Sequence, residues 1–210
     1  LSTMRKTTAK KLESSVLKEL PDLNLANARF QVQLSQVCGE AGLPQPDNDG
    51  ETLMQINRRG TDQAEFLFSA NRNRELQPVS QIASGGEISR LMLCLKSMIA
   101  GATALPTIIF DEIDTGTSGE VADKVGAIME EMSKQMQVIA ITHLPQIASR
   151  GHSHFVVYKE DTADTVSTQL RQLAAKERVA EIARMLSGAE VSVQAVENAR
   201  VMLGEGGIVL

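Results

Sequence analysis

Cysteine is scarce in this chain of 210 residues: only Cys38 and Cys94 occur, far apart and outside any paired motif. Two distant cysteines exclude a disulfide framework and a cysteine-based metal site, and they suggest buried thiols in a reducing compartment. Long apolar runs are also absent, and no signal peptide opens the chain. We therefore expect no membrane span and no export signal.

An excess of positive charge is absent as well. The formal net charge is −5, with 21 Lys and Arg against 26 Asp and Glu. This balance argues against a protein that coats nucleic acid over its whole surface, although it leaves room for a local basic patch. A hydrophobic content of 42% and a charged content of 22% indicate a globular chain that is long enough to bury a core.

The first 20 residues predict a helix that ends at Pro21. Its apolar stripe recurs at steps of three and four residues and consists of Leu1, Met4, Thr8, Leu12, Val16 and Leu20. A stripe this thin suits a two-helix coiled coil better than a globular core. The chain starts with Leu inside this helical pattern, so we expect it to be part of a longer protein.

Residues 21–79 change character. Three stretches alternate as strands do, at 28–37, 51–58 and 63–70. Between the first two, residues 39–50 contain Pro44, Pro46, Asn48 and Gly50, which predict a turn-rich loop.

A glycine pair precedes a predicted helix at 88–100. Ser84 and Glu87 are spaced as a capping box, which would explain this start structurally. Gly85 and Gly86 need another reason, because each glycine costs on the order of 0.8–1 kcal/mol against Ala inside a helix. Glycines help where a ligand approaches the backbone, and free N–H groups at a helix N-terminus attract anions. The second interpretation is therefore a phosphate site.

A βαβ unit follows. Residues 107–110 predict a strand, a helix runs from about 119 to 134, and residues 137–142 predict the next strand. Parallel strands joined by a right-handed crossover have both carboxyl ends at the same edge of the sheet. A hairpin at 154–173 and helices at 177–186 and 193–203 complete the predicted elements.

The strand ends of this unit carry polar residues. Asp111, Glu112 and Asp114 follow the first strand, and His143 follows the second. Taken alone, the acidic stretch is either a metal site or a solvated turn. Its position beside His143 favours the metal site and catalysis.

Four motifs in this order resemble those of ABC-type ATPases. Residues 84–87 resemble the ABC signature, and residues 107–112 resemble a Walker B strand with its catalytic glutamate. Residues 114–116 are similar to the D-loop, and residues 141–143 to the switch histidine. The sequences around these motifs, at 82–90, 110–119 and 142–148, closely resemble those of the RecN family of bacterial SMC-like ATPases that repair DNA double-strand breaks.

The resemblance implies an α/β fold. The chain would be the C-terminal lobe of an ABC/SMC-type P-loop NTPase head, with a mostly parallel sheet flanked by helices and an N-terminal coiled-coil stub. Its segments would be the end of a coiled-coil helix at 1–20, a strand-rich segment at 21–79 and the head lobe at 80–210.

The resemblance also implies ATP hydrolysis with ATP and Mg²⁺ as cofactors. Asp111 would hold Mg²⁺ through water, and Glu112 would act as general base or position the attacking water. His143 would contact the γ-phosphate and stabilise developing charge. Asp114 would lie at the interface between two heads. The residues that close over a nucleotide held mainly by the other subunit would be Ser84, Gly85, Gly86 and Glu87.

The phosphate-cradling loop G-x-x-x-x-G-K-[ST] occurs nowhere in the sequence. In SMC-like proteins this loop belongs to an N-terminal lobe. The implied partners are therefore that lobe, a second head, and DNA through the full-length protein, in the cytoplasm at the nucleoid and not at a membrane. ATP would join two heads and hydrolysis would release them, and we expect this chain to be inactive alone.

Three rival interpretations stay open. A transporter's nucleotide-binding subunit has a helical subdomain before the signature, whereas strand-like segments at 51–70 precede it here. Another SMC-like or ABC-type head would carry the same motifs. A non-catalytic assembly module would use Asp111 and Glu112 as an acidic docking face.

Overall fold

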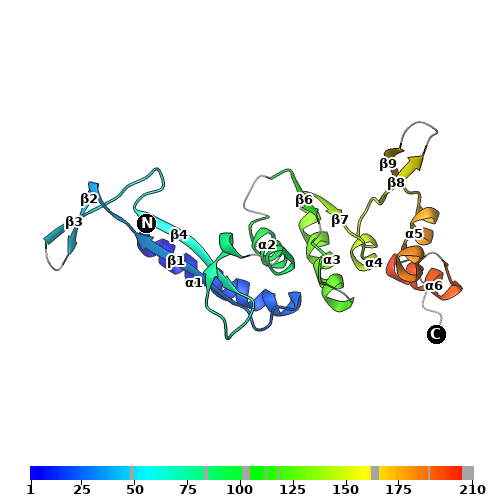
Figure 1. The fold of residues 1–210 in the computed structure, drawn as a ribbon, viewed down its shortest axis with the longest axis horizontal. Coiled ribbons are helices and arrows are strands. Elements are labelled where there is room, and N and C mark those ends of the chain that lie inside the picture. Colours follow the sequence, from blue (N-terminus) through cyan, green and yellow to red (C-terminus); the bar gives the residue numbers. More distant parts are fainter. Residues whose placement is uncertain are drawn as a thin grey trace. The chain divides into compact units, whose positions relative to one another are not determined.

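The structure is a computed structural model that describes residues 1–47, 50–82, 85–100, 105–111, 113–117, 119–161, 166–188 and 190–204. The chain divides into two compact units, Leu1–Leu95 and Lys96–Leu210, and each unit is described by itself. Helices and strands are mixed along the chain (Figure 1), which confirms the α/β expectation. The expected mostly parallel sheet is wrong for the described residues, because only the pair of strands joined by a helix crossover, residues 107–111 and 137–141, is parallel and the other strand pairs are antiparallel. No helix within the described ranges is both long enough and apolar enough to cross a membrane.

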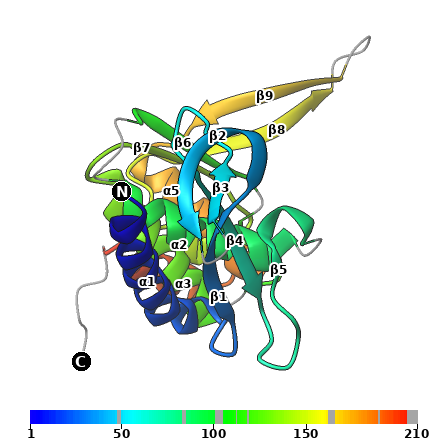
Figure 2. The same ribbon diagram turned by 90° about the vertical axis from the view of Figure 1, so that its left-hand side faces the viewer.

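The first unit combines a long helix with antiparallel strands. Helix α1 lies along β1, and β4 pairs with β1 on one side and with β5 on the other (Figures 1 and 2). The elements of this unit are α1 (Ser2–Glu19), a 3₁₀ turn (Leu20–Leu23), β1 (Arg29–Gln36), β2 (Cys38–Asp47), β3 (Gly50–Met54), β4 (Asp62–Ser69), β5 (Gln77–Pro78), a second 3₁₀ turn (Val79–Gln81) and α2 (Gly85–Ile99).

The predicted first helix is confirmed, but only the second half of its apolar stripe is buried. Val16 and Leu20 near its end are fully buried, whereas Leu1 and Met4 at its start are exposed. Packing against β1 explains the buried half, because an amphipathic helix buries its apolar face against a sheet. The coiled-coil interpretation of this helix stays a prediction.

The predicted turn-rich loop at 39–50 is wrong. Most of this stretch belongs to β2, which pairs antiparallel with β3, with Pro44 opposite Leu53 and Pro46 opposite Glu51. Residues two apart in a strand point their backbone nitrogens to the same side. Both prolines can therefore face the outer side, where the described residues place no second strand and no ladder donor is needed.

One further expectation is corrected in the first unit. Cys38 at the start of β2 is exposed, whereas Cys94 in α2 is buried as predicted. The hairpin of β2 and β3 is only two strands wide, so it offers little cover for Cys38. In α2, Leu91 is fully buried, whereas Ile99 at the helix end is exposed.

The second unit contains the predicted βαβ arrangement. Strands β6 and β7 are parallel, and α3 connects them and buries Val125, Met129 and Met132. The hairpin of β8 and β9 projects away from α5 (Figures 1 and 2). The elements of this unit are β6 (Thr107–Asp111), α3 (Gly119–Ser133), β7 (Gln137–Ile141), α4 (Pro145–Ala148), β8 (Phe155–Asp161), β9 (Val166–Gln172), α5 (Ala175–Ser187) and α6 (Val193–Met202).

The last two helices pack on each other through one isoleucine and three alanines. Ile182 and Ala183 of α5 meet Ala195 and Ala199 of α6 in a buried cluster. The side chain of Ser192 accepts a hydrogen bond from the backbone N–H of Ala195 at 3.1 Å, which satisfies one of the free donors at the start of α6.

Candidate functional site

The carboxyl ends of β6 and β7 lie side by side. Ile109 is opposite Ile139 in the register, and Asp111 is opposite Ile141. Asp111 is the last residue of β6, and His143 lies two residues beyond the end of β7, at the same edge. Asp111 is exposed, so its oxygens can reach a hard cation such as Mg²⁺, which prefers carboxylate and water ligands.

Asp114 is buried just beyond this edge, with a side chain only 2% exposed. Its Oδ2 atom accepts hydrogen bonds from the hydroxyl of Thr142 at 2.5 Å and from the backbone N–H of His143 at 2.9 Å. The ring Nδ1 of His143 lies 3.0 Å from the same oxygen. Burying a carboxylate costs free energy unless donors compensate, and these three groups provide that compensation.

Both turns around this carboxylate are held by further hydrogen bonds. The backbone N–H and the hydroxyl of Thr117 donate to the carbonyl of Asp114 at 3.0 and 2.8 Å. The hydroxyl of Thr142, which donates to Asp114, accepts from the backbone N–H of Leu144 at 3.0 Å. Leu144 directly precedes α4, so the network joins the turn after β6 to the start of that helix.

The ring of His143 is 74% exposed although its Nδ1 atom is engaged. The two nitrogens of an imidazole lie on different sides of the ring, so Nε2 is left for another partner. An exposed ring nitrogen at the functional edge of a sheet is what contact with a ligand requires. The contact with a phosphate that the sequence predicts for His143 stays a prediction.

Gly85 and Gly86 form the first turn of α2. Among the described residues, none has an atom within 4 Å of a Cβ atom added at Gly85, so this part of the chain leaves room for a ligand beside the turn. Gly86 and Glu87 follow in the same turn. Ser84 lies outside the described residues, and the capping-box interpretation therefore stays a prediction.

The predicted site residues fall into both units. Asp111, Asp114 and His143 belong to the second unit, and the start of α2 belongs to the first. Glu112, the predicted general base, lies outside the described residues. Among the residues that the structure does describe, no group of three or more His, Cys, Asp or Glu side chains is placed to hold a metal ion.

Sequence reasoning missed the burial of Arg90. This side chain is buried in α2, and its Nε atom has no hydrogen-bond acceptor within the described part of the chain. Burial lowers the pKa of the Arg90 guanidinium, and the charge of Glu87 opposes that shift. An amphipathic pattern assigns a charged residue to the solvent side, so only its position three residues after Glu87 could have drawn attention to it.

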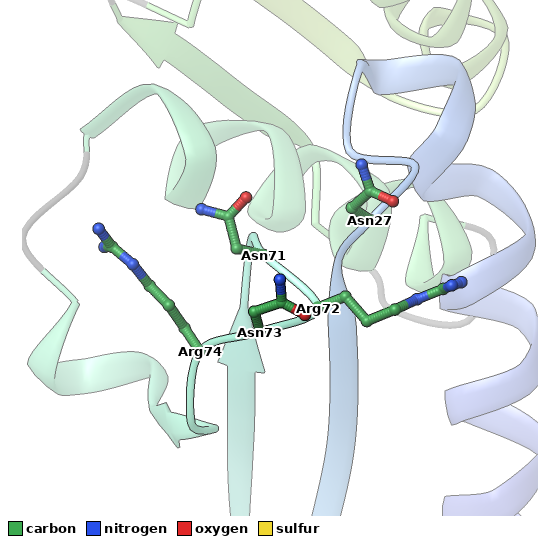
Figure 3. Close-up of a pocket in the computed structure, with 5 residues that line it drawn as sticks. All are labelled: Asn27, Asn71, Arg72, Asn73 and Arg74. Atoms are coloured by element: carbon green, nitrogen blue, oxygen red, sulfur yellow. The ribbon is translucent and has the colours of Figure 1, made fainter.

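Two cavities lie elsewhere. One, of about 390 Å³, is lined by Asn27, Asn71, Arg72, Asn73 and Arg74 (Figure 3). Its lining offers amide and guanidinium donors but no carboxylate or nucleophile, and the two arginines extend in different directions. The other, of about 330 Å³, is lined by residues of α3 and of the segments beside α4 and α6. Neither lining includes a predicted site residue.

The chain is similar in sequence to DNA repair proteins named RecN. It is 36% identical over 203 residues to that of Bacillus subtilis, 34% over 203 residues to that of Haemophilus influenzae and 36% over 207 residues to that of Treponema pallidum. These alignments cover 97%, 97% and 98% of this chain, but only 35%, 34% and 34% of the relatives. The chain thus spans about a third of the length of these relatives. No family model matches it.

Solved structures with a similar fold are SMC head domains. The Smc head domain with a coiled coil and joint from Pyrococcus yayanosii matches with a TM-score of 0.57 and 16% identity, over 85% of this chain and 29% of that one. The Smc head domain with an extended coiled coil from Pyrococcus furiosus, bound to the C-terminal domain of ScpA, matches with a TM-score of 0.54 and 17% identity, over 88% of this chain and 39% of that one. At this identity the likeness concerns the fold, and it agrees with the head-lobe architecture expected from the sequence.

Proposed function

Since the chain belongs by sequence with the RecN proteins over the third of their length that it spans, we propose that it is the C-terminal lobe of the ATPase head of an SMC-like DNA repair protein. The observation that carries the proposal is the shared edge of β6 and β7. There Asp111 ends one parallel strand, and the ring of His143 projects just beyond the other. This is the order in which a nucleotide-hydrolysing sheet presents its metal ligand and its phosphate contact.

Each of the site residues would have a separate role in ATP hydrolysis. Asp111 would hold Mg²⁺ through water, Glu112 would take a proton from the attacking water or position it, and His143 would contact the γ-phosphate. Bound Mg²⁺ and ATP would supply the charge neutralisation and the scissile bond. The open first turn of α2, with Gly85 and Gly86, fits an anion that approaches backbone N–H groups. Asp114 would lie close to the surface on which two heads meet.

An exposed apolar face on the β6–β7 pair supports the proposal that another lobe binds there. Ile109, Ile139 and Ile141 are each between 41% and 62% exposed, and they share one face of the β6–β7 pair with Asp111. Parallel strands are normally covered on both faces. We propose that an N-terminal lobe, which carries the phosphate-cradling loop, covers this face and completes the nucleotide site.

The wider role follows the relatives. Two such heads would associate when nucleotide is bound and separate after hydrolysis, and the full-length protein would act on DNA at the nucleoid, in the cytoplasm. The competing interpretation is a lobe that only assembles with its partner. It predicts the same covered face but no turnover.

The test is reconstitution from two lobes. The N-terminal lobe of the same protein, containing G-x-x-x-x-G-K-[ST], is expressed separately and mixed with this chain, and Mg²⁺-dependent release of phosphate from ATP is measured. We expect negligible turnover by either lobe alone and clear turnover by the mixture. Glu112→Gln should lower the turnover of the mixture by about a hundredfold or more, the lower end of what a general base contributes.

The control is Glu197→Gln, which neutralises an exposed carboxylate on α6 and should leave turnover unchanged. Binding of the two lobes without turnover would support the assembly module instead. Turnover by this chain alone, abolished by Glu112→Gln, would contradict the split site.

A further inference from the structure

We infer that Asp114 is a positioning residue that fixes both the ring orientation and the tautomer of His143. The inference deepens the function proposed above and rests on it for the chemical role of His143. The geometry that supports it involves only Asp114, Thr142 and His143, so it can be tested without nucleotide.

The tautomer follows from what a carboxylate can do. An ionised carboxylate only accepts hydrogen bonds, so the ring atom 3.0 Å from Oδ2 of Asp114 must carry a proton. That atom is Nδ1. In a neutral imidazole the other nitrogen then has no proton, and Nε2 of His143 presents a lone pair to the exposed side of the ring.

The orientation follows from two contacts between the same pair of residues. Oδ2 of Asp114 accepts a hydrogen bond from the backbone N–H of His143 at 2.9 Å, and it lies 3.0 Å from the ring Nδ1 of the same residue. An acceptor shared by the backbone and the ring of one residue restricts rotation of that side chain. The hydroxyl of Thr142 anchors the same oxygen at 2.5 Å, and the 2% exposure of Asp114 leaves little room for it to move away.

This arrangement limits what His143 can do at a reaction site. A neutral ring held through Nδ1 accepts a hydrogen bond at Nε2, from a water molecule or a hydroxyl group. It donates to a phosphate oxygen only after Nε2 has gained a proton. Carboxylates that hold metal-binding histidines through the far nitrogen fix tautomer and orientation in this way, and their loss typically costs about 10–100-fold in metal affinity or activity. We expect a loss of the same order here.

The first test is the tautomer itself. Histidine nitrogens of the chain are labelled with ¹⁵N, and long-range ¹H–¹⁵N spectra are recorded in alkaline buffer, where imidazole rings are neutral. The chain has three histidines, and His143→Gln identifies the signals of the ring in question. We expect Nδ1 of His143 to show the shift of a protonated nitrogen and Nε2 that of an unprotonated one. The reverse pattern in the unmodified chain would overturn the inference, whatever the variants do.

The second test changes the partner. Asp114→Asn keeps the size of the side chain but should move His143 towards the other tautomer or a mixture of both. Thr142→Val is the matched control, because it removes one donor to Asp114 and leaves the ring contact in place. An unchanged tautomer in a folded Asp114→Asn chain would contradict the proposed role.

The third test measures catalysis by the reconstituted lobes. Asp114→Asn should lower kcat by about 10–100-fold with little change in KM for ATP. Glu197→Gln, at an exposed carboxylate on α6 outside this network, is the control and should leave kcat unchanged. An unchanged kcat for Asp114→Asn would overturn the positioning role. If the unmodified lobes hydrolyse no ATP, the proposed function fails, and the tautomer measurement still decides the relation between Asp114 and His143.

Discussion

The ring of His143 and the carboxylate of Asp114 meet at 3.0 Å, although 29 residues separate them in the sequence. Asp114 belongs to the turn after β6 and His143 to the turn after β7. Their contact therefore connects the ends of β6 and β7. Asp111, the predicted metal ligand, lies at the first end, and His143, the predicted phosphate contact, follows the second.

The first prediction concerns how much the contacts of Asp114 contribute to the stability of the chain. Asp114→Ala should lower the free energy of unfolding by about 1–3 kcal/mol, because it leaves the partly buried hydroxyl of Thr142 and backbone N–H of His143 without this acceptor. Thr142→Val should cost less, since the contacts between Asp114 and His143 remain. Urea unfolding followed by circular dichroism measures both, and a larger loss for Thr142→Val would contradict the central place of Asp114.

The second prediction concerns the close approach of α3 and α4. A Cβ atom at Gly126 would lie 2.7 Å from Cδ of Arg150 and 3.2 Å from the backbone oxygen of Gln146. The side chain of Arg150 also binds Asp123 and Glu130, so displacing it would break those contacts. Gly126→Ala should therefore destabilise the chain by about 1 kcal/mol, the lower end of the cost of overpacking, despite the better helix propensity of Ala.

A second glycine serves as a comparison, because its replacement by Ala should stabilise the chain. Gly85 is the first residue of α2, and an added Cβ there meets no atom of the described residues within 4 Å. Gly85→Ala should stabilise the chain by a few tenths of a kcal/mol up to about 1 kcal/mol through helix propensity alone. Urea midpoints of the two variants compare the effects directly, and a stabilising Gly126→Ala would show that α3 and α4 are not in close contact.

The third prediction uses the two thiols. Cys38 is exposed, whereas Cys94 is buried, and burial together with Glu19 raises the pKa of the Cys94 thiol to about 12. Only the thiolate reacts quickly with a disulfide reagent. Titration of the folded chain should thus find one rapidly reacting thiol, which Cys38→Ser removes, and a second one only after unfolding. Rapid reaction of both thiols in the folded chain would contradict the buried position of Cys94.

The fourth prediction is a pH dependence at the start of α1. Hydrogen bonds from Ser2, Arg5 and Gln36 lower the pKa of the Asp62 carboxyl. A group whose pKa is lower in the folded chain stabilises that chain above its ordinary pKa of about 3.9, and this contribution disappears as the pH falls through the lowered value. Asp62→Asn should therefore flatten the loss of stability below about pH 4.

The control for this prediction is Glu65→Gln, which changes an exposed carboxylate on the same strand. The midpoint of urea unfolding is measured for both variants and for the unmodified chain between about pH 2 and pH 7. If the two variants follow the same curve, the contacts of Asp62 with α1 do not contribute to stability.

Hydrophobic periodicity predicted most of the fold. The strands that end at Asp111 and before His143, and the helix between them, were found because buried positions repeat at fixed steps along regular elements. The strand β2 was missed because Pro44 and Pro46 are turn residues by composition. Whether a proline fits a strand depends on which side of that strand is paired, and this is known only from the register.

The candidate site was predicted less completely. The predicted βαβ crossover placed Asp111, Asp114 and His143 at one edge, but the sequence does not reveal that the Asp114 side chain turns inward to contact His143. That contact depends on the path of two turns whose ends are far apart along the chain. Arg90 was missed for a related reason, since a charged residue on a helix is assigned to solvent until the neighbouring elements are known.

The two prolines of β2 have a consequence for how the protein behaves in concentrated solution. A strand edge with free N–H and C=O groups can recruit a strand from another molecule, and this is the first step of β-type aggregation. Pro44 and Pro46 have no N–H group, so wherever their nitrogens face the unpaired side of β2 they offer no donor to a strand of another molecule. We expect that replacing both with Thr would make this edge of the β2–β3 hairpin more prone to pair with another molecule.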